Sequence, residues 1–224
     1  MRRVSDSTVA RLSMYLRLLN ELAADGVVTL ASSELARRCG TSAAQVRKDL
    51  SLFGTFGKRG QGYPVRELIG ALRHILGLER RWRVGLIGAG KIGAALMAYR
   101  DFREQGFDIV AVFDNDPAKI GLEWNGLRVQ RDADLEVALR SGIDIVIIAV
   151  PAESAQAVVN RVVAGGVRAV LNFAPTKLDV PAHVEVKTVN MAMEMESLSY
   201  ALVNAGRGRS VAARSEAAAR SRDG

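Results

Sequence analysis

Apolar residues recur along the chain with two different periods, and the change between them falls near residue 82. Before that point they recur every three or four positions, as in amphipathic helices. This pattern predicts helices over residues 7–25, 33–39, 43–52 and 65–78. After it, short apolar runs alternate with helical stretches, which is typical of a parallel sheet covered by helices. The pattern therefore predicts two domains of different fold.

The first predicted helix, 7–25, has a single apolar face and clear signals at both ends. Asp6 or Ser7 is suited to cap its start, and Gly26 ends it. The apolar residues that share its inner face are Val9, Leu12, Leu16, Leu19 and Leu22. A short strand is predicted to follow over residues 27–30.

The next two helices are joined by a glycine turn at Gly40, which is a helix-turn-helix pattern. Ser42 and Gln45 have the spacing of a capping box, so the second of these helices is predicted to start at residue 43. This helix alternates apolar inner positions with side chains that read base edges or grip phosphates. Its candidate DNA contacts are Gln45, Arg47 and Lys48. A polar surface helix without a DNA partner would show the same pattern.

A glycine-rich segment, residues 53–64, follows that helix and contains three aromatic and two basic residues. The glycines allow a tight hairpin, and the regularly placed aromatic side chains indicate packing against the domain. Lys58 and Arg59 would then lie at the tip of a wing that can reach phosphates or the minor groove.

The charge of the chain is concentrated in its first part. Residues 1–81 carry 14 Lys and Arg against 7 Asp and Glu, whereas residues 82–224 carry 17 of each, so the formal charge of +7 lies in the first domain. A basic domain joined to a neutral one favours a polyanion as partner, although a solvated basic surface gives the same count. Residues 206–224 lack apolar periodicity and are predicted to be a disordered basic tail.

The second domain begins with an apolar run, residues 84–87, and the sequence Gly88-Ala89-Gly90-Lys91-Ile92-Gly93. A strand, a glycine turn and a helix form the context of a dinucleotide fingerprint. Gly88 allows the tight turn, Gly90 lets a pyrophosphate approach the backbone, and Gly93 lets the helix pack closely on the strand. The helix, predicted over residues 94–99, would favour phosphates at its start.

A second predicted strand, 108–113, ends in Asp114, which has the position of an acid that binds a ribose 2′-hydroxyl. Asp114 lies 26 residues after Gly88, against about 20 in the usual fingerprint. Its carboxylate would repel a 2′-phosphate, so NAD and NADH are favoured over their 2′-phosphorylated forms. A helix cap or turn is the alternative role, because Asn115, Asp116 and Pro117 follow it.

The rest of the chain continues the alternation of strands and helices. Strands are predicted over residues 143–150, 167–171 and 184–189, and a helix over 134–141. Val150 and Pro151, at the end of a strand, are candidates to hold the ribose next to a nicotinamide. A last helix, 191–204, is apolar on more than one face and is predicted to be buried at a subunit interface. The predicted fold class is α/β, with a winged-helix domain before a Rossmann-type doubly wound parallel sheet.

Several features narrow the class of protein. The single cysteine, Cys39, excludes an intramolecular disulfide, and the longest apolar run is far too short to span a membrane, so a cytoplasmic protein is expected. We find no metal-ligand pattern and no acid/base pair for hydride transfer, since His74 and His183 lie in different domains. An NAD-dependent dehydrogenase with a basic appendage and a coenzyme A-binding regulator remain as alternatives.

Seven stretches of this sequence match one family closely. They are Arg11-Leu-x-x-Tyr-Leu-Arg17, Ser33-Glu-Leu-Ala36, Gln45-Val-Arg-Lys-Asp-Leu-Ser51 with Phe53-Gly54, Gly60-x-Gly-Tyr63, Gly88-x-Gly-x-x-Gly93, Phe113-Asp114 and Glu194 to Leu202. On these motifs the sequence resembles the Rex-type redox-sensing transcriptional repressors over residues 8–204. The block at 45–63 is long and unusual, which makes the match specific.

The resemblance implies a non-enzymatic homodimer that binds a palindromic operator in double-stranded DNA and is released by NADH, so that it reads the NADH/NAD ratio. It implies that Arg47 and Lys48 contact the operator from the recognition helix and Arg59 from the wing. Tyr99 and Met191 would lie near the nicotinamide. This chain has Asn190 where family members often carry aspartate, so the resemblance does not extend to an ion pair from that position.

Four segments follow from these predictions. They are a winged-helix DNA-binding domain (1–81), a Rossmann NAD(H)-binding domain (82–190), a C-terminal dimerisation helix (191–205) exchanged between subunits, and the basic tail (206–224). The candidate nicotinamide lining is mostly apolar and consists of Phe173, Ala174, Met191 and Tyr99. Burying the positively charged NAD ring there would be costly, so tighter binding of neutral NADH is expected.

Overall fold

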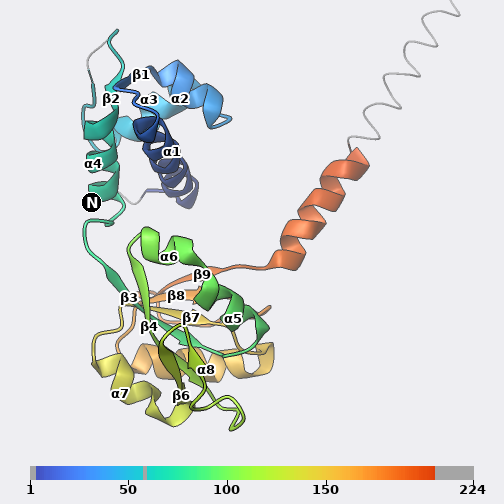
Figure 1. Cartoon of the computed structure of the whole chain (residues 1–224). Helices are drawn as coiled ribbons and strands as arrows, with labels where there is room; N and C mark the ends of the chain where they lie inside the picture. Colours follow the sequence, from blue (N-terminus) through green and yellow to red (C-terminus); the bar gives the residue numbers. More distant parts are fainter. Residues whose placement is uncertain (1–3, 58–59, 205–224) are drawn as a thin grey trace, which may run out of the picture. The chain divides into compact units, whose positions relative to one another are not determined.

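The computed structural model of the chain describes residues 4–57 and 60–204. Lys58, Arg59 and the predicted basic tail therefore lie outside the described residues. The chain divides into two compact units, Met1–Arg81 and Trp82–Gly224. Figure 1 shows helices and one short ladder in the first unit, and a sheet covered by helices in the second.

The N-terminal unit is built from short helices around a leucine-rich core. In chain order it contains α1 (Asp6–Ala24), β1 (Thr29–Leu30), α2 (Ser32–Arg38), α3 (Ala43–Ser51), β2 (Tyr63–Pro64) and α4 (Val65–Ile75). β1 pairs antiparallel with β2, so the ladder joins the two ends of a segment that contains α2, α3 and the glycine-rich wing. Tyr63 is buried and Phe53 and Phe56 are packed against the core, as expected for the aromatic residues of the wing.

The start and the inner face of α1 differ from the prediction. Ser5, rather than Asp6 or Ser7, caps the helix, because its hydroxyl accepts a hydrogen bond from the backbone N–H of Thr8 at 3.3 Å. Val9 is exposed, whereas Thr8 and Tyr15 are buried beside the predicted leucines. Both polar side chains tolerate burial because their hydroxyls have hydrogen-bond partners in Arg11 and Asp49.

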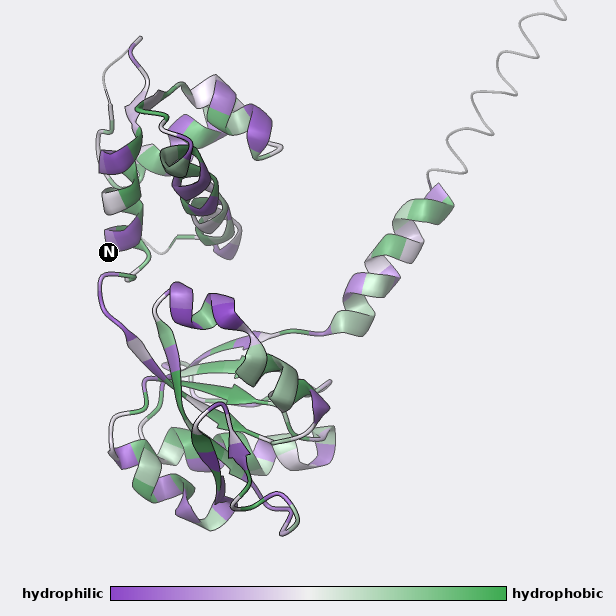
Figure 2. Cartoon of the chain, in the orientation of Figure 1, coloured by the Kyte–Doolittle hydropathy of each residue, from purple (hydrophilic) through white to green (hydrophobic). Residues whose placement is uncertain are grey.

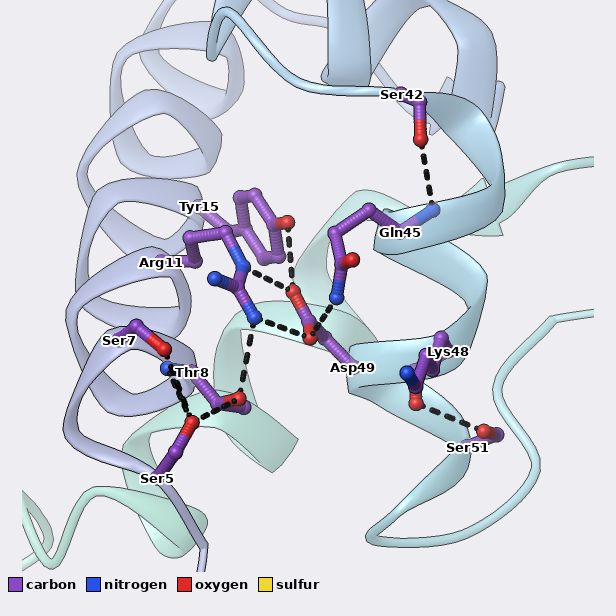
Figure 3. A network of polar contacts seen from close by, with 10 residues as sticks. All are labelled: Ser5, Ser7, Thr8, Arg11, Tyr15, Ser42, Gln45, Lys48, Asp49 and Ser51. Atoms are coloured by element: carbon purple, nitrogen blue, oxygen red, sulfur yellow. Dashed lines mark hydrogen bonds and ion pairs between the residues drawn. The ribbon is translucent and has the colours of Figure 1, made fainter.

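A buried carboxylate joins α1 to α3. Asp49 on α3 is 1% exposed and accepts hydrogen bonds from Arg11 Nε at 2.6 Å, Arg11 Nη2 at 2.7 Å and the Tyr15 hydroxyl at 3.0 Å (Figure 3). Burial raises the pKa of the Asp49 carboxyl, but the hydrogen bonds from Arg11, Gln45 and Tyr15 outweigh it and hold the pKa below its usual value. The ionised carboxylate therefore fixes which face of α3 turns inward.

The second unit contains a sheet of seven strands. Its elements are β3 (Trp82–Ile87), α5 (Lys91–Ala98), α6 (Arg100–Glu104), β4 (Phe107–Asp114), β5 (Glu123–Trp124), β6 (Leu127–Arg131), η1 (Asp132–Asp134), α7 (Leu135–Arg140), β7 (Ile145–Ile148), α8 (Ala152–Ala164), β8 (Ala169–Asn172) and β9 (Glu185–Thr188). The strand order is β5-β6-β4-β3-β7-β8-β9. β5 and β6 are antiparallel, and all other neighbouring strands are parallel.

Neighbouring residues of the central strands pack on opposite faces of the sheet. Leu86, Val112 and Ile147 contact one cluster, which includes side chains of α5 and α6. Ile87, Phe113 and Ile148 contact the other, under α7 and α8. Figure 2 shows these strands as hydrophobic along most of their length, because both faces are covered. The predicted doubly wound parallel sheet is therefore confirmed, apart from the antiparallel pair β5 and β6 at one edge.

Some elements of this unit were not predicted or differ in their bounds. β5 and β6 lie at one edge of the sheet and mix polar with apolar residues, so they lack the apolar run that marks a buried strand. α5 begins at Lys91 rather than at residue 94, because Gly90 caps it and accepts a hydrogen bond from Ala94 N–H at 2.9 Å. Tyr99 has an extended backbone, with φ −77° and ψ 99°, and separates α5 from the unpredicted α6.

The turn between β3 and α5 depends on two glycines. A Cβ on Gly93 would lie 2.0 Å from the carbonyl oxygen of Gly88, so the helix could not pack at its observed distance. Gly88 has φ +104°, and a Cβ there would lie 2.4 Å from the carbonyl oxygen of Ala149, which directly follows the neighbouring strand β7. A Cβ on Gly90 would meet no atom within 4 Å. Two glycines therefore serve the fold, while the third borders open space.

Residues 191–204 form the predicted last helix. Residues 191–203 are exposed in the single chain, and their predicted burial at a subunit interface stays a prediction. Within the described ranges, no helix combines the length and the apolar character that a membrane span requires.

Replacing Gly93 with alanine is expected to destabilise the second unit. The new methyl group would meet the Gly88 carbonyl, and overpacking of this kind costs about 1–3 kcal/mol or more. Chemical denaturation followed by circular dichroism measures the loss. Gly90→Ala is the matched control, because its methyl group enters open space, and an equal loss in both variants would contradict the assigned roles.

Candidate functional site

The outer side of α3 presents two basic side chains. Arg47 and Lys48 are exposed, whereas Val46, Asp49 and Leu50 are buried against the rest of the unit. Arg47 Nη1 donates a hydrogen bond to Ser32 Oγ at the start of α2, at 3.0 Å. Because the inner face is fixed by the leucine core and by Asp49, both basic side chains lie on the solvent-exposed side of α3. This is the arrangement that a recognition helix requires in a major groove.

Gln45 lies at the start of α3 and is half-buried. Ser42 Oγ accepts a hydrogen bond from Gln45 N–H at 3.1 Å, as the capping-box spacing predicts. The side chain of Gln45 does not return to the Ser42 backbone. Instead, its Nε2 donates to Asp49 Oδ1 at 2.7 Å (Figure 3). The structure thus places Gln45 between the domain interior and the outer face of the helix.

A cleft of about 1040 Å³ lies at the carboxyl ends of β3, β4, β7 and β8. β4 and β7 flank β3 on opposite sides, so the cleft is at the point where the order of the sheet reverses. Open α/β sheets bind their ligands at this point. The predicted site residues that line the cleft are Gly88, Gly90, Lys91, Ile92, Asp114, Val150 and Pro151.

Asp114 connects the glycine turn to the end of β4. Its Oδ2 accepts a hydrogen bond from Ala89 N–H at 2.6 Å, and its Oδ1 accepts one from Asp116 N–H at 2.8 Å. Burial raises the pKa of the Asp114 carboxyl, but the N–H groups of Asp116 and Ala89 and the amine of Lys119 hold it below its usual value. The carboxylate therefore stabilises the turn after β4, which is the alternative role considered for Asp114, and it also lines the cleft.

Two cations in the cleft were missed by the sequence analysis. Lys119 Nζ lies 3.2 Å from Asp114 Oδ2 and 3.5 Å from Asp116 Oδ2. Arg161 on α8 makes ion pairs with Asp132 and with Glu136, and the hydrogen bonds that its guanidinium donates to Glu136 and Asp132 raise its pKa. Lys119 could have been suspected, since it is a basic residue in the turn after a strand-end acid. Arg161 has no such signal.

The other predicted residues lie outside the cleft lining. Ala89 and Gly93 are buried and build the turn itself. Tyr99 lies at the far end of α5 from the glycines, where its hydroxyl donates to Asp101 Oδ2 at 2.9 Å and its ring packs edge-on against Phe102. Met191 is 63% exposed at the start of the last helix. Within one chain, neither Tyr99 nor Met191 borders the cleft.

The predicted nicotinamide lining is only partly found in one chain. Phe173 borders the cleft together with Pro175, whereas Ala174 is buried beneath the surface. The cleft also contains Glu153, a carboxylate that the sequence analysis did not include, and this side chain is exposed to solvent. Among residues 4–57 and 60–204, no group of three or more His, Cys, Asp or Glu is suited to hold a metal ion.

Two family models match the chain, one in each unit. A model described as the putative DNA-binding protein N-terminus matches residues 3–51, and the CoA binding domain model matches residues 79–176. Redox-sensing transcriptional repressor Rex of Carboxydothermus hydrogenoformans is 47% identical over 88% of this chain and 96% of its own length. The Rex protein of Desulfitobacterium hafniense is 45% identical over 88% and 95%.

The chain belongs to the Rex family of redox-sensing transcriptional repressors. Two solved structures of the Rex-family repressor RSP have the same fold. RSP in complex with NADH has a TM-score of 0.85, with 33% identity over 94% of this chain and all of its own. RSP in complex with NAD⁺ and operator DNA has a TM-score of 0.88, with 34% identity over 94% and 98%. The relatives are named as repressors, which does not favour the dehydrogenase alternative.

Proposed function

We propose that this Rex-family chain binds operator DNA through α3 and a nicotinamide dinucleotide in the cleft, and that NADH releases it from the DNA. The observation that carries the proposal is the presence of both sites in one chain. Arg47 and Lys48 are exposed on a helix held by a packed core, and the glycine turn opens on a cleft at the sheet's reversal point. Operator binding would place the protein in the cytoplasm with the chromosome.

The dinucleotide would lie across the cleft with its pyrophosphate at the start of α5. The backbone of Gly90 borders open space there, and the positive end of the helix favours the phosphates. Asp114 would accept a hydrogen bond from the adenine ribose, while Val150 and Pro151 would border the nicotinamide ribose. Phe173 and Pro175 also line the cleft, and apolar contacts of this kind with the nicotinamide would favour the neutral ring of NADH over the cation of NAD.

Coenzyme A is the second candidate ligand, because the CoA binding domain model matches residues 79–176. It contains a pyrophosphate that the same glycine turn would accept. Asp114 disfavours its 3′-phosphate, although Lys119 offsets part of that negative charge. The ligand titrations below include coenzyme A for this reason.

A homodimer is part of the proposal. The helix 191–204 exposes a set of large apolar side chains in one chain, and these are Met191, Met193, Met195, Leu198, Tyr200, Leu202 and Val203. A second copy that exchanged this helix would cover them. A two-fold dimer would also present two copies of α3, which matches a palindromic operator.

Leu198→Glu is expected to weaken the dimer, because it places a charge among apolar side chains that a partner would bury. Analytical ultracentrifugation at micromolar concentration should show dimers for the intact chain and monomers for the variant. Glu196→Gln, on the same helix, is the control and should remain dimeric. A monomeric intact chain would contradict the exchanged helix.

Arg47→Ala and Lys48→Ala are expected to weaken operator binding while NADH binding is unchanged. Each lost base contact should cost about 1–3 kcal/mol. Fluorescence anisotropy with labelled operator measures the affinity, with and without equal concentrations of NADH, NAD and coenzyme A. Release by NADH but not by NAD is the expected result. Unchanged DNA affinity in both variants, or equal release by NADH and NAD, is evidence against the proposal.

Gly90→Val should abolish dinucleotide binding with little loss of stability, because its side chain would fill the space of the pyrophosphate.

Asp114→Ala should weaken the affinity for NADH by about tenfold or more, as expected for a lost hydrogen bond to a charged group. It should also narrow the preference for NADH over NADPH. Isothermal titration calorimetry measures both. Gly70→Val is the control, since Gly70 lies on α4 and also has open space. An unchanged preference in Asp114→Ala would refute the ribose role.

A further inference from the structure

Asp49 contacts both the domain interior and a candidate base-reading side chain. Its carboxylate accepts hydrogen bonds from Arg11 and Tyr15 on α1, and from Gln45, which lies one turn earlier on the same helix. Figure 3 shows these three side chains converging on the two oxygens of Asp49. Arg11 and Tyr15 hold the carboxylate in place from inside the domain. Gln45 is the one of the three that lies on α3.

The contact decides how the amide of Gln45 is oriented. A glutamine amide has a donor nitrogen and an acceptor oxygen of similar size, and rotation by half a turn exchanges them. An ionised carboxylate accepts hydrogen bonds and donates none, so the nitrogen must face Asp49. The observed bond from Gln45 Nε2 to Asp49 Oδ1, at 2.7 Å, has this orientation. The amide oxygen is therefore held on the side away from the carboxylate.

We propose that Asp49 is a specificity-determining residue that makes Gln45 read the operator through its amide oxygen. The proposal rests on operator binding through α3, as proposed above. An acceptor in the major groove selects a base edge that carries an exocyclic amine, which is adenine N6 or cytosine N4. Exchange of the two bases of the contacted pair puts a carbonyl oxygen, from thymine or guanine, in place of that amine.

Asp49 would act through Gln45 and would not touch the DNA, since it is buried. Arg47 and Lys48 give the matched comparison on the same helix. Arg47 donates a hydrogen bond to Ser32, and among the described residues no side-chain hydrogen bond or ion pair joins Arg47 or Lys48 to Asp49. A change at Asp49 should therefore alter the preference at one base pair of each half-site and leave the other preferences of the operator unchanged.

The test uses the intact chain and an operator selected by it from random double-stranded DNA. Every base pair of one half-site is exchanged in turn, and binding is measured by anisotropy. Gln45→Ala identifies the contacted pair as the one whose preference is lost. At that pair the unchanged chain should prefer the selected operator by about tenfold, within the range of a good base contact. Asp49→Asn should reduce that preference to below about twofold. An asparagine amide can donate or accept a hydrogen bond, so it no longer fixes which end of the Gln45 amide faces it.

Tyr15→Phe is the control for a structural effect. It removes one hydrogen bond from the same carboxylate without touching Gln45, so the preference should remain. Gln45→Glu gives a second result that does not depend on how Asp49→Asn folds. Glutamate presents oxygen in the groove, so it should keep the same preferred base pair at lower affinity.

Each outcome decides between the two proposals. A uniform loss of affinity in Asp49→Asn, with the preference intact, overturns the role of Asp49. A Gln45→Glu variant that prefers the exchanged pair, or a Gln45→Ala variant with no changed position, does the same. In these cases operator binding itself stands. If the unchanged chain selects no operator, the proposed function fails, and the role of Asp49 fails with it.

Discussion

The close approach of α5 to the end of β3 is the constraint on which the second unit depends. Gly93 packs against the Gly88 carbonyl with no room for a Cβ, and Gly88 turns the chain with a positive φ. This approach places the start of α5 over the carboxyl ends of the strands. The cleft, the position of Gly90 and the bond between Ala89 and Asp114 all follow from it.

The N-terminal unit has a corresponding constraint of a different kind. There the fixed element is a charge, since Asp49 is ionised and buried among Arg11, Tyr15 and Gln45. A charge of this kind is costly to bury unless every partner is present. The network therefore ties the direction of α3 to α1, and the same bonds orient a side chain that faces DNA in the proposed function. Stability and recognition would then share one carboxylate.

The last helix illustrates how an exposed surface supports a proposal. A helix apolar on several sides lowers its free energy by removing those side chains from water. Residues 191–203 are exposed in one chain, so that gain is available to a partner. In a dimer, Met191 could reach the cleft of the other chain, although it does not border the cleft of its own chain. Its proposed exchange thus connects the folding of one subunit to assembly.

The sequence by itself determined the local features. Amphipathic periods, the Ser42 cap and Gly88-x-Gly90-x-x-Gly93 are encoded within a few residues, so the helices of the first unit, the parallel sheet and the cleft residues near the turn were predictable. Other features join distant segments. Asp49 with Arg11, Asp114 with Ala89, and Arg161 in the cleft depend on packing between elements. The edge strands β5 and β6 could not be predicted either, because they have no apolar run of their own. They form strands because they pair with a neighbouring strand. Tertiary structure alone decided these, since a buried carboxylate takes its partners from whatever the fold brings near it.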